Sequence, residues 1–283
     1  AAAEALAAAR HPLVEAGGGV HLSGAAAELA ALQEAAHLPV GTTVMGKGAV
    51  DETHPLSLGV VGYVMGLGAR THALRPMVGR ADVVLLVGNR TNQNGTDSWK
   101  LFGPDTRFVH LDADPAEVGR NYEAEHRLVG DAKLTLAALA EALRGRDLSA
   151  RAEARPRVER EIASAVAGWR ETISGVSARD GGSCRPERVM AELDRLLGPE
   201  DIAVADASYA SIWLANHLTA KRAGQRFLTP RGIAGLGWGL PMAIGARIAA
   251  DEAGSGGRVV CLCGDGGFAH SWAELETLRR MEL

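Results

Sequence analysis

A carboxylate set between glycines is the part of this sequence whose residue types point most clearly to chemistry. Asp265 stands between Gly264 and Gly266-Gly267, directly after the apolar run 259–262 and before a helical pattern over 271–278. Glycines let backbone N–H groups approach phosphate oxygens, and an Asp can hold a hard divalent cation between those oxygens. The stretch therefore predicts a site for a metal-bound diphosphate, although Gly-Asp-Gly alone also occurs in ordinary tight turns.

Two further segments carry candidate binding residues. The glycine-rich stretch 232–246 contains Gly235-Leu236-Gly237 and continues into a helical pattern. A strand predicted at 202–205 ends at Asp206 and is followed by Ser208 and Tyr209, at the start of a predicted helix. Ligands of α/β proteins bind at the carboxyl ends of parallel strands, so these turns are candidates for one site.

The elements that must position these residues form two alternating series. In the first half we predict strands at 13–16, 39–43, 81–88 and 107–112, a helix over 23–36 with Ser23 as N-cap, and a helix over 131–143. In the second half we predict a helix from Pro186, strands at 202–205, 227–228 and 259–263, and helices between them. This alternation indicates an α/β fold with doubly wound parallel sheets.

A change in composition separates the two series. Residues 144–182 are rich in Arg and Glu and end near Gly181-Gly182, which indicates a solvated linker with a surface helix. We therefore expect a nucleotide-binding-like domain over 1–150, a linker over 151–185, and a second α/β domain over 186–283.

Bulk composition excludes several classes of protein. The chain has 283 residues, a formal net charge of −4 and 47% hydrophobic residues, so it has no basic footprint for nucleic acid. No apolar run approaches the ~18 residues needed to span a bilayer, so we expect no membrane partner. The three cysteines suit small buried side chains in a reducing cytoplasm. A Gly-x-Gly-x-x-Gly turn with an acidic residue ~20 positions later is missing, which disfavours a dehydrogenase.

Taken together, these segments resemble the thiamine-diphosphate enzymes of the acetolactate synthase and benzoylformate decarboxylase type. The resemblance runs over nearly the whole chain, and the order of the motifs is specific for the superfamily rather than for one reaction. Residues 16–20 resemble the opening of that family's central domain, 88–90 its Gly-Ala-Arg turn, 110–119 its Asp-x-Asp-x-x-Glu-x-Gly segment, 235–241 the stretch that supports the thiamine ring, and 264–266 its metal motif.

The resemblance implies an architecture of three α/β domains, of which this chain corresponds to the central domain and the first part of the diphosphate-binding domain. We expect the pyrimidine-binding domain, with its activating glutamate, and a second metal ligand, an Asn, to lie outside it. Because such enzymes build each active site from two subunits, a homodimer or homotetramer is implied.

The resemblance also implies roles for individual residues. Asp265 would bind Mg²⁺, while Gly266 and Gly267 donate N–H groups to the diphosphate of thiamine diphosphate. Ser208 and Tyr209 match positions that contact the diphosphate, the alternative being a capping serine and a packed tyrosine. Gly235 and Leu236 would bind the aminopyrimidine.

Leu236 also has an implied catalytic role, because it occupies the place of the bulky residue that holds the cofactor bent. The alternative is that it is a core leucine in a glycine-rich turn.

In the central domain, five residues match nucleotide-contacting positions of relatives: Gly17, Gly18, Gly88, Arg90 and Asp112. Relatives carry FAD, an adenine nucleotide or nothing there, and the alternative is that the glycines serve only tight turns. Arg90 favours an anionic nucleotide.

The expected function is that of a carboligase or decarboxylase acting on a 2-oxo acid, like acetolactate synthase. The alternatives are a thiamine-diphosphate-dependent acyl-CoA lyase and a non-catalytic nucleotide-binding fragment. Arg231 departs from the synthases, which have glycine at this position. It would pair with a substrate carboxylate or cap the loop.

Overall fold

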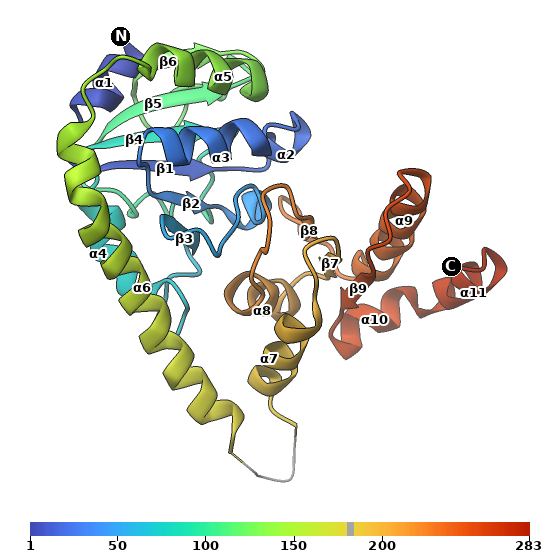
Figure 1. The fold of residues 1–283 in the computed structure, drawn as a ribbon. Helices are drawn as coiled ribbons and strands as arrows, with labels where there is room; N and C mark the ends of the chain where they lie inside the picture. Colours follow the sequence, from blue (N-terminus) through green and yellow to red (C-terminus); the bar gives the residue numbers. More distant parts are fainter. Residues whose placement is uncertain (180–183) are drawn as a thin grey trace.

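The computed structural model describes residues 1–179 and 184–283, so Gly181-Gly182, expected to end the linker, lies outside the described residues. The described chain forms two parallel sheets, each flanked by helices (Figure 1). This arrangement confirms the prediction of an α/β fold with parallel sheets.

The first sheet has six parallel strands in the order β3-β2-β1-β4-β5-β6. The strands are β1 (Pro12–Ala16), β2 (Val40–Thr42), β3 (Ser57–Val60), β4 (Val83–Val87), β5 (Arg107–Asp112) and β6 (Ala124–Val129). The strand order reverses between β1 and β4. Adjacent loops diverge at such a point and leave a crevice at the carboxyl ends of the strands.

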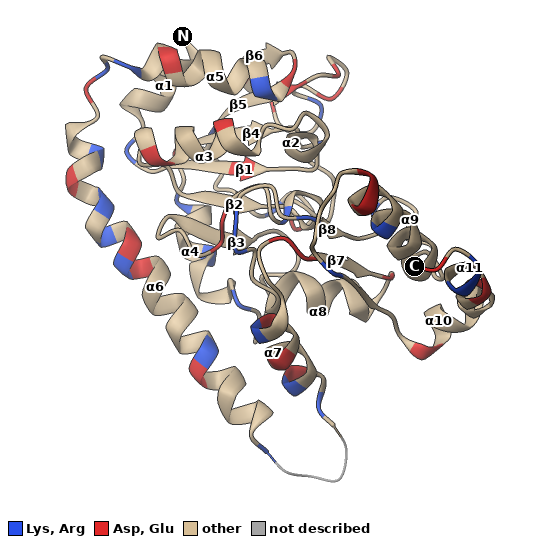
Figure 2. Cartoon of the chain, turned by 45° about the vertical axis from the view of Figure 1, so that its right-hand side comes forward, with Lys and Arg blue, Asp and Glu red and all other residues tan. Residues whose placement is uncertain are grey.

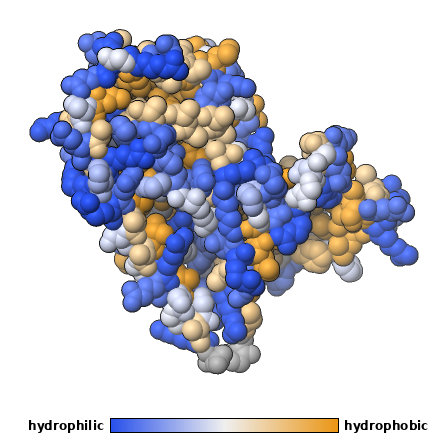
Figure 3. Space-filling view, in the orientation of Figure 1, coloured by the Kyte–Doolittle hydropathy of each residue, from blue (hydrophilic) through white to orange (hydrophobic). Residues whose placement is uncertain are grey.

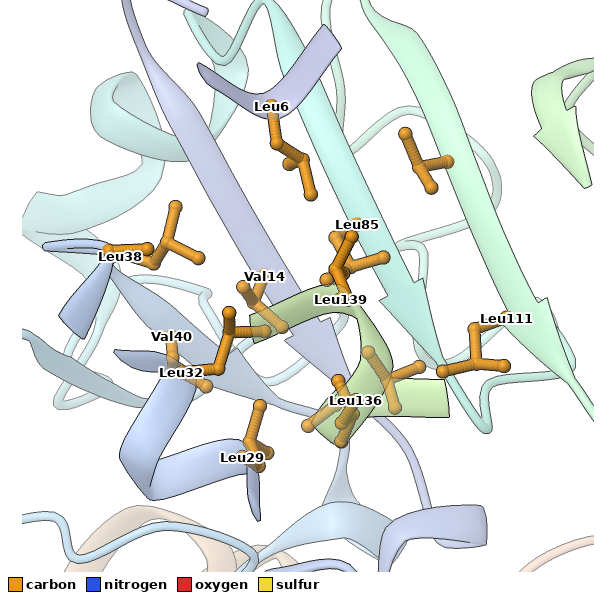
Figure 4. Close-up of a cluster of buried hydrophobic side chains, with 14 of the residues drawn as sticks. Leu6, Val14, Leu29, Leu32, Leu38, Val40, Leu85, Leu111, Leu136 and Leu139 are labelled. Atoms are coloured by element: carbon orange, nitrogen blue, oxygen red, sulfur yellow. The ribbon is translucent and has the colours of Figure 1, made fainter. Parts of the chain in front are cut away.

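Helices cover both faces of this sheet. One face is packed by α1 (Ala2–Ala8), α3 (Ala26–Ala35) and α5 (Ala132–Leu143), whose leucines meet the strand side chains (Figure 4). Strand β4 shows why both faces are apolar. Val83, Leu85 and Val87 belong to this core, while Val84 and Leu86 point into a second core with α4 (Arg75–Gly79) and α6 (Ser149–Ser177).

Helix α6 is 29 residues long and accounts for most of the segment expected to contain a linker and a surface helix. Acidic and basic residues are interspersed along it (Figure 2). Ile162 is nevertheless buried in the second core, and Arg80 forms an ion pair with Glu161 at 2.6 Å. Much of this helix is therefore part of the first unit, while the proposed domain boundaries stay predictions.

The second sheet has the order β8-β7-β9, with β7 (Ile202–Ala205), β8 (Phe227–Leu228) and β9 (Val259–Leu262) all parallel. Its helices are α7 (Pro186–Leu196), α8 (Tyr209–His217), α9 (Gly239–Glu252), α10 (Asp265–Ser271) and α11 (Leu275–Arg280). Short helices α2 (Gly19–Leu22), η1 (Val44–Gly46), η2 (His72–Leu74) and η3 (Trp272–Glu274) complete the described chain.

Three details differ from the sequence-based expectation. Ser23 is not the N-cap of α3: it follows α2, and its hydroxyl donates to Asp131 at 2.6 Å, while Ala25 precedes α3. Strands β3 and β6 were not predicted. The helical region after β9 begins at Asp265 itself rather than at residue 271, with Gly264 as the N-cap residue of α10.

The two sheets are joined by a buried polar cluster. Glu52 accepts a hydrogen bond from Lys47 Nζ at 2.7 Å and from Arg70 Nη1 at 3.2 Å. The same carboxylate accepts the backbone N–H of Ala220, in the second half, at 3.1 Å, and Arg70 also donates to Thr219. The carboxylate is thus shared between the halves and holds them together.

Across the described residues, no helix is long and apolar enough to cross a membrane.

Candidate functional site

Asp206, at the carboxyl end of β7, brings the two glycine-rich motifs of the second sheet together. Its side chain is buried, with Oδ1 accepting from the N–H of Ala207 at 2.7 Å and Oδ2 from that of Gly237 at 2.9 Å. A Cβ added to Gly267 would lie 2.2 Å from Oδ2 of Asp206, so only glycine permits this approach. The turns 235–237 and 264–267 therefore meet at one carboxylate.

Asp265 opens α10 and is exposed. Within the described residues its carboxylate makes no hydrogen bond or ion pair, so it is available for a cation. Gly264 and Gly266 beside it have open space where a side chain would stand. The first N–H groups of a helix also lack partners inside the helix.

The donor set fits Mg²⁺ better than a metal that needs a full protein cage. No group of three or more His, Cys, Asp or Glu that could hold a metal occurs in the described part of the chain. Mg²⁺ is commonly held by one or two carboxylates together with phosphate oxygens and water. Asp265 supplies one such carboxylate, and a diphosphate would supply further oxygens.

Ser208 and Tyr209 lie at the start of α8, beside Asp206. Ser208 is the N-cap residue with φ 67°, a left-handed value that a serine rarely adopts, and its side chain makes no capping hydrogen bond. Such a conformation costs on the order of 1–3 kcal/mol and is common at functional sites. Tyr209 is 75% exposed, which contradicts the alternative of a packed tyrosine.

Gly235 and Leu236 lie in the turn that Asp206 holds through Gly237. Leu236 is 54% exposed, so it is not the core leucine of the alternative interpretation. An exposed leucine on a turn held by a buried carboxylate is available to contact a ligand. Its expected role under the thiamine ring stays a prediction.

The five residues predicted to contact a nucleotide all line one cleft of about 780 Å³. The cleft opens at the carboxyl ends of β1, β4 and β5, where the strand order reverses. A Cβ on Gly17 would lie 2.2 Å from the carbonyl oxygen of Gly88, so this pair is also required by close packing of the two turns. Gly18, Arg90 and Asp112 complete the predicted set.

Among the charged side chains that line the cleft and form no ion pair with one another, the positive ones outnumber the negative ones. Arg120 is neutralised by Glu117 at 2.9 Å. Arg90 has no side-chain partner in the described part of the chain, and Arg231 enters the wall from the second half. Asp112 accepts the backbone N–H of Asp114. The arrangement suits an anionic ligand with hydroxyl groups.

Sequence reasoning missed two polar residues at this edge. Glu15 on β1 is fully buried, and burial raises the pKa of its carboxyl to about 8 against the lowering effect of its hydrogen bond from Asn89. Asn89 Nδ2 donates to Glu15 Oε2 at 2.7 Å, and Asn89 itself lines the cleft. A Glu inside a strand was the available signal, because carboxylates are rarely fully buried.

Asp206 was noted only as the end of a strand. Its role depends on Gly237, 31 positions away. No local pattern shows that contact.

Apolar side chains are exposed near the metal motif. Phe268, Trp272 and Leu275 are 38%, 65% and 47% exposed, and orange side chains gather on the lobe of α10 and α11 in Figure 3. A surface of this kind is typical of a contact site.

Two family models match this chain, one in each half. The family described as "Thiamine pyrophosphate enzyme, central domain" matches residues 1–139, and "Thiamine pyrophosphate enzyme, C-terminal TPP binding domain" matches residues 206–283. The first match contains the five predicted cleft residues, and the second contains Arg231, Asp206 and Asp265.

Three curated relatives are similar over almost the whole chain. A "Probable acetolactate synthase large subunit" of Methanocaldococcus jannaschii is 34% identical over 100% of the chain, and one of Methanococcus aeolicus is 32% identical over 98%. An "Acetolactate synthase" of Mycobacterium leprae is 32% identical over 98%. The chain spans 46%, 46% and 42% of these proteins, less than half their length. With its two matched regions and the geometry above, this chain belongs to the thiamine pyrophosphate enzyme family.

Proposed function

We propose that the full-length protein is a thiamine-diphosphate- and Mg²⁺-dependent carboligase or decarboxylase that acts on a 2-oxo acid, as an acetolactate synthase does. The observation that carries this proposal is the contact of Asp206 with both motif turns, through Gly237 and Gly267. The proposal is supported because Gly237, in the turn expected to support the ring, and Gly267, in the turn expected to hold the metal, both approach Asp206. The similarity to acetolactate synthases supports the choice of reaction.

When bound, thiamine diphosphate supplies a nucleophilic carbon and an electron sink for chemistry at a substrate carbonyl. The chain's own residues bind and orient it. Asp265 would hold Mg²⁺, and the N–H groups of Gly266 and Gly267, with Ser208 and Tyr209, would receive the diphosphate.

The turn of Gly235 and Leu236 would hold the aminopyrimidine. Leu236 would support the bent form of the cofactor from the side of the ring.

A second cofactor is proposed for the cleft. Its glycine turns, the unpaired Arg90 and the position of Asp112 support an adenine nucleotide or FAD. A diphosphate would lie near the arginines, and a ribose hydroxyl could donate to Asp112.

We also propose a homo-oligomer in the cytoplasm. The exposed Phe268, Trp272 and Leu275 support a contact between subunits, and the three free cysteines support a reducing compartment.

Titration calorimetry on the full-length protein tests the proposed function. Thiamine diphosphate should bind in the presence of Mg²⁺, and binding should be lost with EDTA. Asp265→Asn should weaken it by roughly 100-fold or more, since a Mg²⁺ ligand is removed. Asp105→Asn, a change at an exposed Asp of the first half, is the matched control and should bind normally. Unchanged affinity in Asp265→Asn would refute the metal site, and the release of CO₂ from pyruvate and longer 2-oxo acids tests the reaction.

A further inference from the structure

Arg231 belongs to two sites at once. It lines the cleft of the first sheet together with its neighbour Gly232. Its guanidinium also donates through Nη2 to the hydroxyl of Ser211, on α8. Arg231 Cζ lies 5.7 Å from the centre of the Tyr63 ring, which comes from the loop after β3. A single side chain therefore connects the cleft, the first unit and α8, the helix that follows Asp206 and Ser208.

The contact continues from Ser211 to the proposed diphosphate site. The Ser211 hydroxyl, fully buried, donates to the carbonyl oxygen of Ser208 at 2.9 Å. Ser208 is the residue with φ 67° that opens α8. Because this backbone conformation is unfavourable for serine, contacts that hold its carbonyl oxygen help to keep the turn in shape.

Arg231 can bind an anion and keep its hydrogen bond to Ser211. A guanidinium has five N–H donors, and only the one on Nη2 is used by Ser211. Its Nε is buried and has no hydrogen-bond partner in the described residues. An anion in the cleft can therefore accept from the remaining donors and hold the side chain in the position that it already has.

We propose that Arg231 is a positioning residue that links the two ligand sites, so that an anionic ligand in the cleft strengthens binding of thiamine diphosphate at the Ser208 turn. The inference rests on the proposed function, because it takes the Ser208 turn as part of the diphosphate site. The expected sign is positive, since both ligands favour the same Arg231–Ser211–Ser208 chain of hydrogen bonds. Linkage then requires that each ligand raise the affinity of the other by the same factor.

Calorimetry on the full-length protein with ADP as the probe of the cleft tests the linkage. Saturating ADP should tighten the binding of thiamine diphosphate with Mg²⁺ by about five-fold or more, and saturating thiamine diphosphate should tighten ADP equally. Equal affinities with and without the other ligand would overturn the proposal. So would a protein that does not bind ADP. A protein that binds ADP but not thiamine diphosphate would instead refute the proposed function.

Three variants separate linkage from simple loss of binding. Ser211→Ala should keep ADP binding and lose the mutual enhancement, because it breaks the chain but leaves the cleft intact. Arg231→Met should lose the enhancement too, and Arg231→Lys should restore only part of it, since an ammonium lacks the planar fork.

Arg90→Met is the matched control. It removes another cleft cation outside the chain of hydrogen bonds, so ADP should bind more weakly while the enhancement at saturation persists. Full enhancement in Ser211→Ala, or its loss in Arg90→Met, would contradict the assignment. If a variant does not fold, the mutual tightening of ADP and thiamine diphosphate binding in the wild-type protein still tests the proposal.

Discussion

At the scale of single residues, two residues of the candidate site have the opposite burial to the one expected from their type. A carboxylate, Asp206, is buried, and the apolar Leu236 is half exposed on a turn that Asp206 holds. A buried carboxylate that accepts two backbone N–H groups fixes the loops that donate them, because leaving a donor unpaired costs about 1–3 kcal/mol. The candidate site is therefore built from backbone held in place, with few side chains reaching into it.

Leu236→Ala should lower turnover more than cofactor affinity. Its proposed task is to hold the cofactor in the reactive shape, while the diphosphate is bound elsewhere, so we expect kcat to fall by about ten-fold or more. Steady-state kinetics and calorimetry on the same preparation measure the two effects. Ile233→Ala, at a fully exposed isoleucine of the same loop, should keep both values. A Leu236→Ala enzyme with full turnover would refute the role.

Glu15 should make stability depend on pH. The folded protein keeps this proton up to about pH 8, whereas the unfolded carboxyl releases it near its ordinary pKa of 4.5. Between these values the folded state binds more protons, so the free energy of unfolding falls as pH rises and levels off above pH 8.

Glu15→Gln should remove that slope and stabilise the protein at pH 8.5 by on the order of 2–4 kcal/mol. Urea unfolding at pH 5 and pH 8.5 measures it. Glu4→Gln, at an exposed glutamate, is the control. Equal pH slopes in Glu15→Gln and wild type would show that Glu15 is ionised in the folded state.

At the scale of elements, the strands of the second sheet and the interior strands of the first sheet were predicted, whereas both edge strands of the first sheet were missed. The ranges 107–112, 202–205 and 227–228 agree residue for residue with β5, β7 and β8. Strand β6, at one edge, alternates exposed residues with buried or half-buried ones and is largely polar, so it lacks the apolar run of an interior strand. Strand β3, at the other edge, is four residues long and contains Gly59 with φ 90°.

The motifs of the second half were predicted to share one site, but the contacts that join them were not predicted. Each motif can be recognised in the sequence, because its glycines and its carboxylate are close neighbours along the chain at the end of a strand. The contacts of Asp206 with Gly237 and of Arg231 with Ser211 depend on tertiary packing, which no spacing in the sequence encodes.

Helix α6 should unfold together with the first sheet rather than as a linker. Ile162 is 4% exposed in the core beneath β4, so Ile162→Ala should lower the free energy of unfolding by about 2–4 kcal/mol. Arg170→Ala, at an exposed position of the same helix, should change it by less than about 0.5 kcal/mol. Thermal unfolding followed by circular dichroism measures both. Similar values for the two variants would mean that α6 contributes little to the core.

At the scale of the whole molecule, the cleft depends on how the two sheets are held together. The cleft takes its wall from both halves, since Arg231 and Gly232 join residues of the first sheet. The carboxylate of Glu52 lies at this junction with Lys47, Arg70 and the backbone of Ala220. Burial lowers the pKa of Lys47, against the opposing effect of Glu52, so this lysine depends on its partner to stay charged.

Glu52→Gln should therefore be among the most damaging single changes outside the sites. It leaves the ammonium of Lys47 buried without a counter-charge, and removing one partner of a buried pair costs about 3–5 kcal/mol. Lys47→Met should cost less, because Arg70 still neutralises the carboxylate. The double variant Lys47→Met/Glu52→Gln should be clearly more stable than the sum of the single changes predicts, since it leaves only Arg70, and no longer Lys47, without a counter-charge. Urea unfolding of the four proteins gives this coupling directly, and additivity within about 0.5 kcal/mol would show that Lys47 and Glu52 do not stabilise each other.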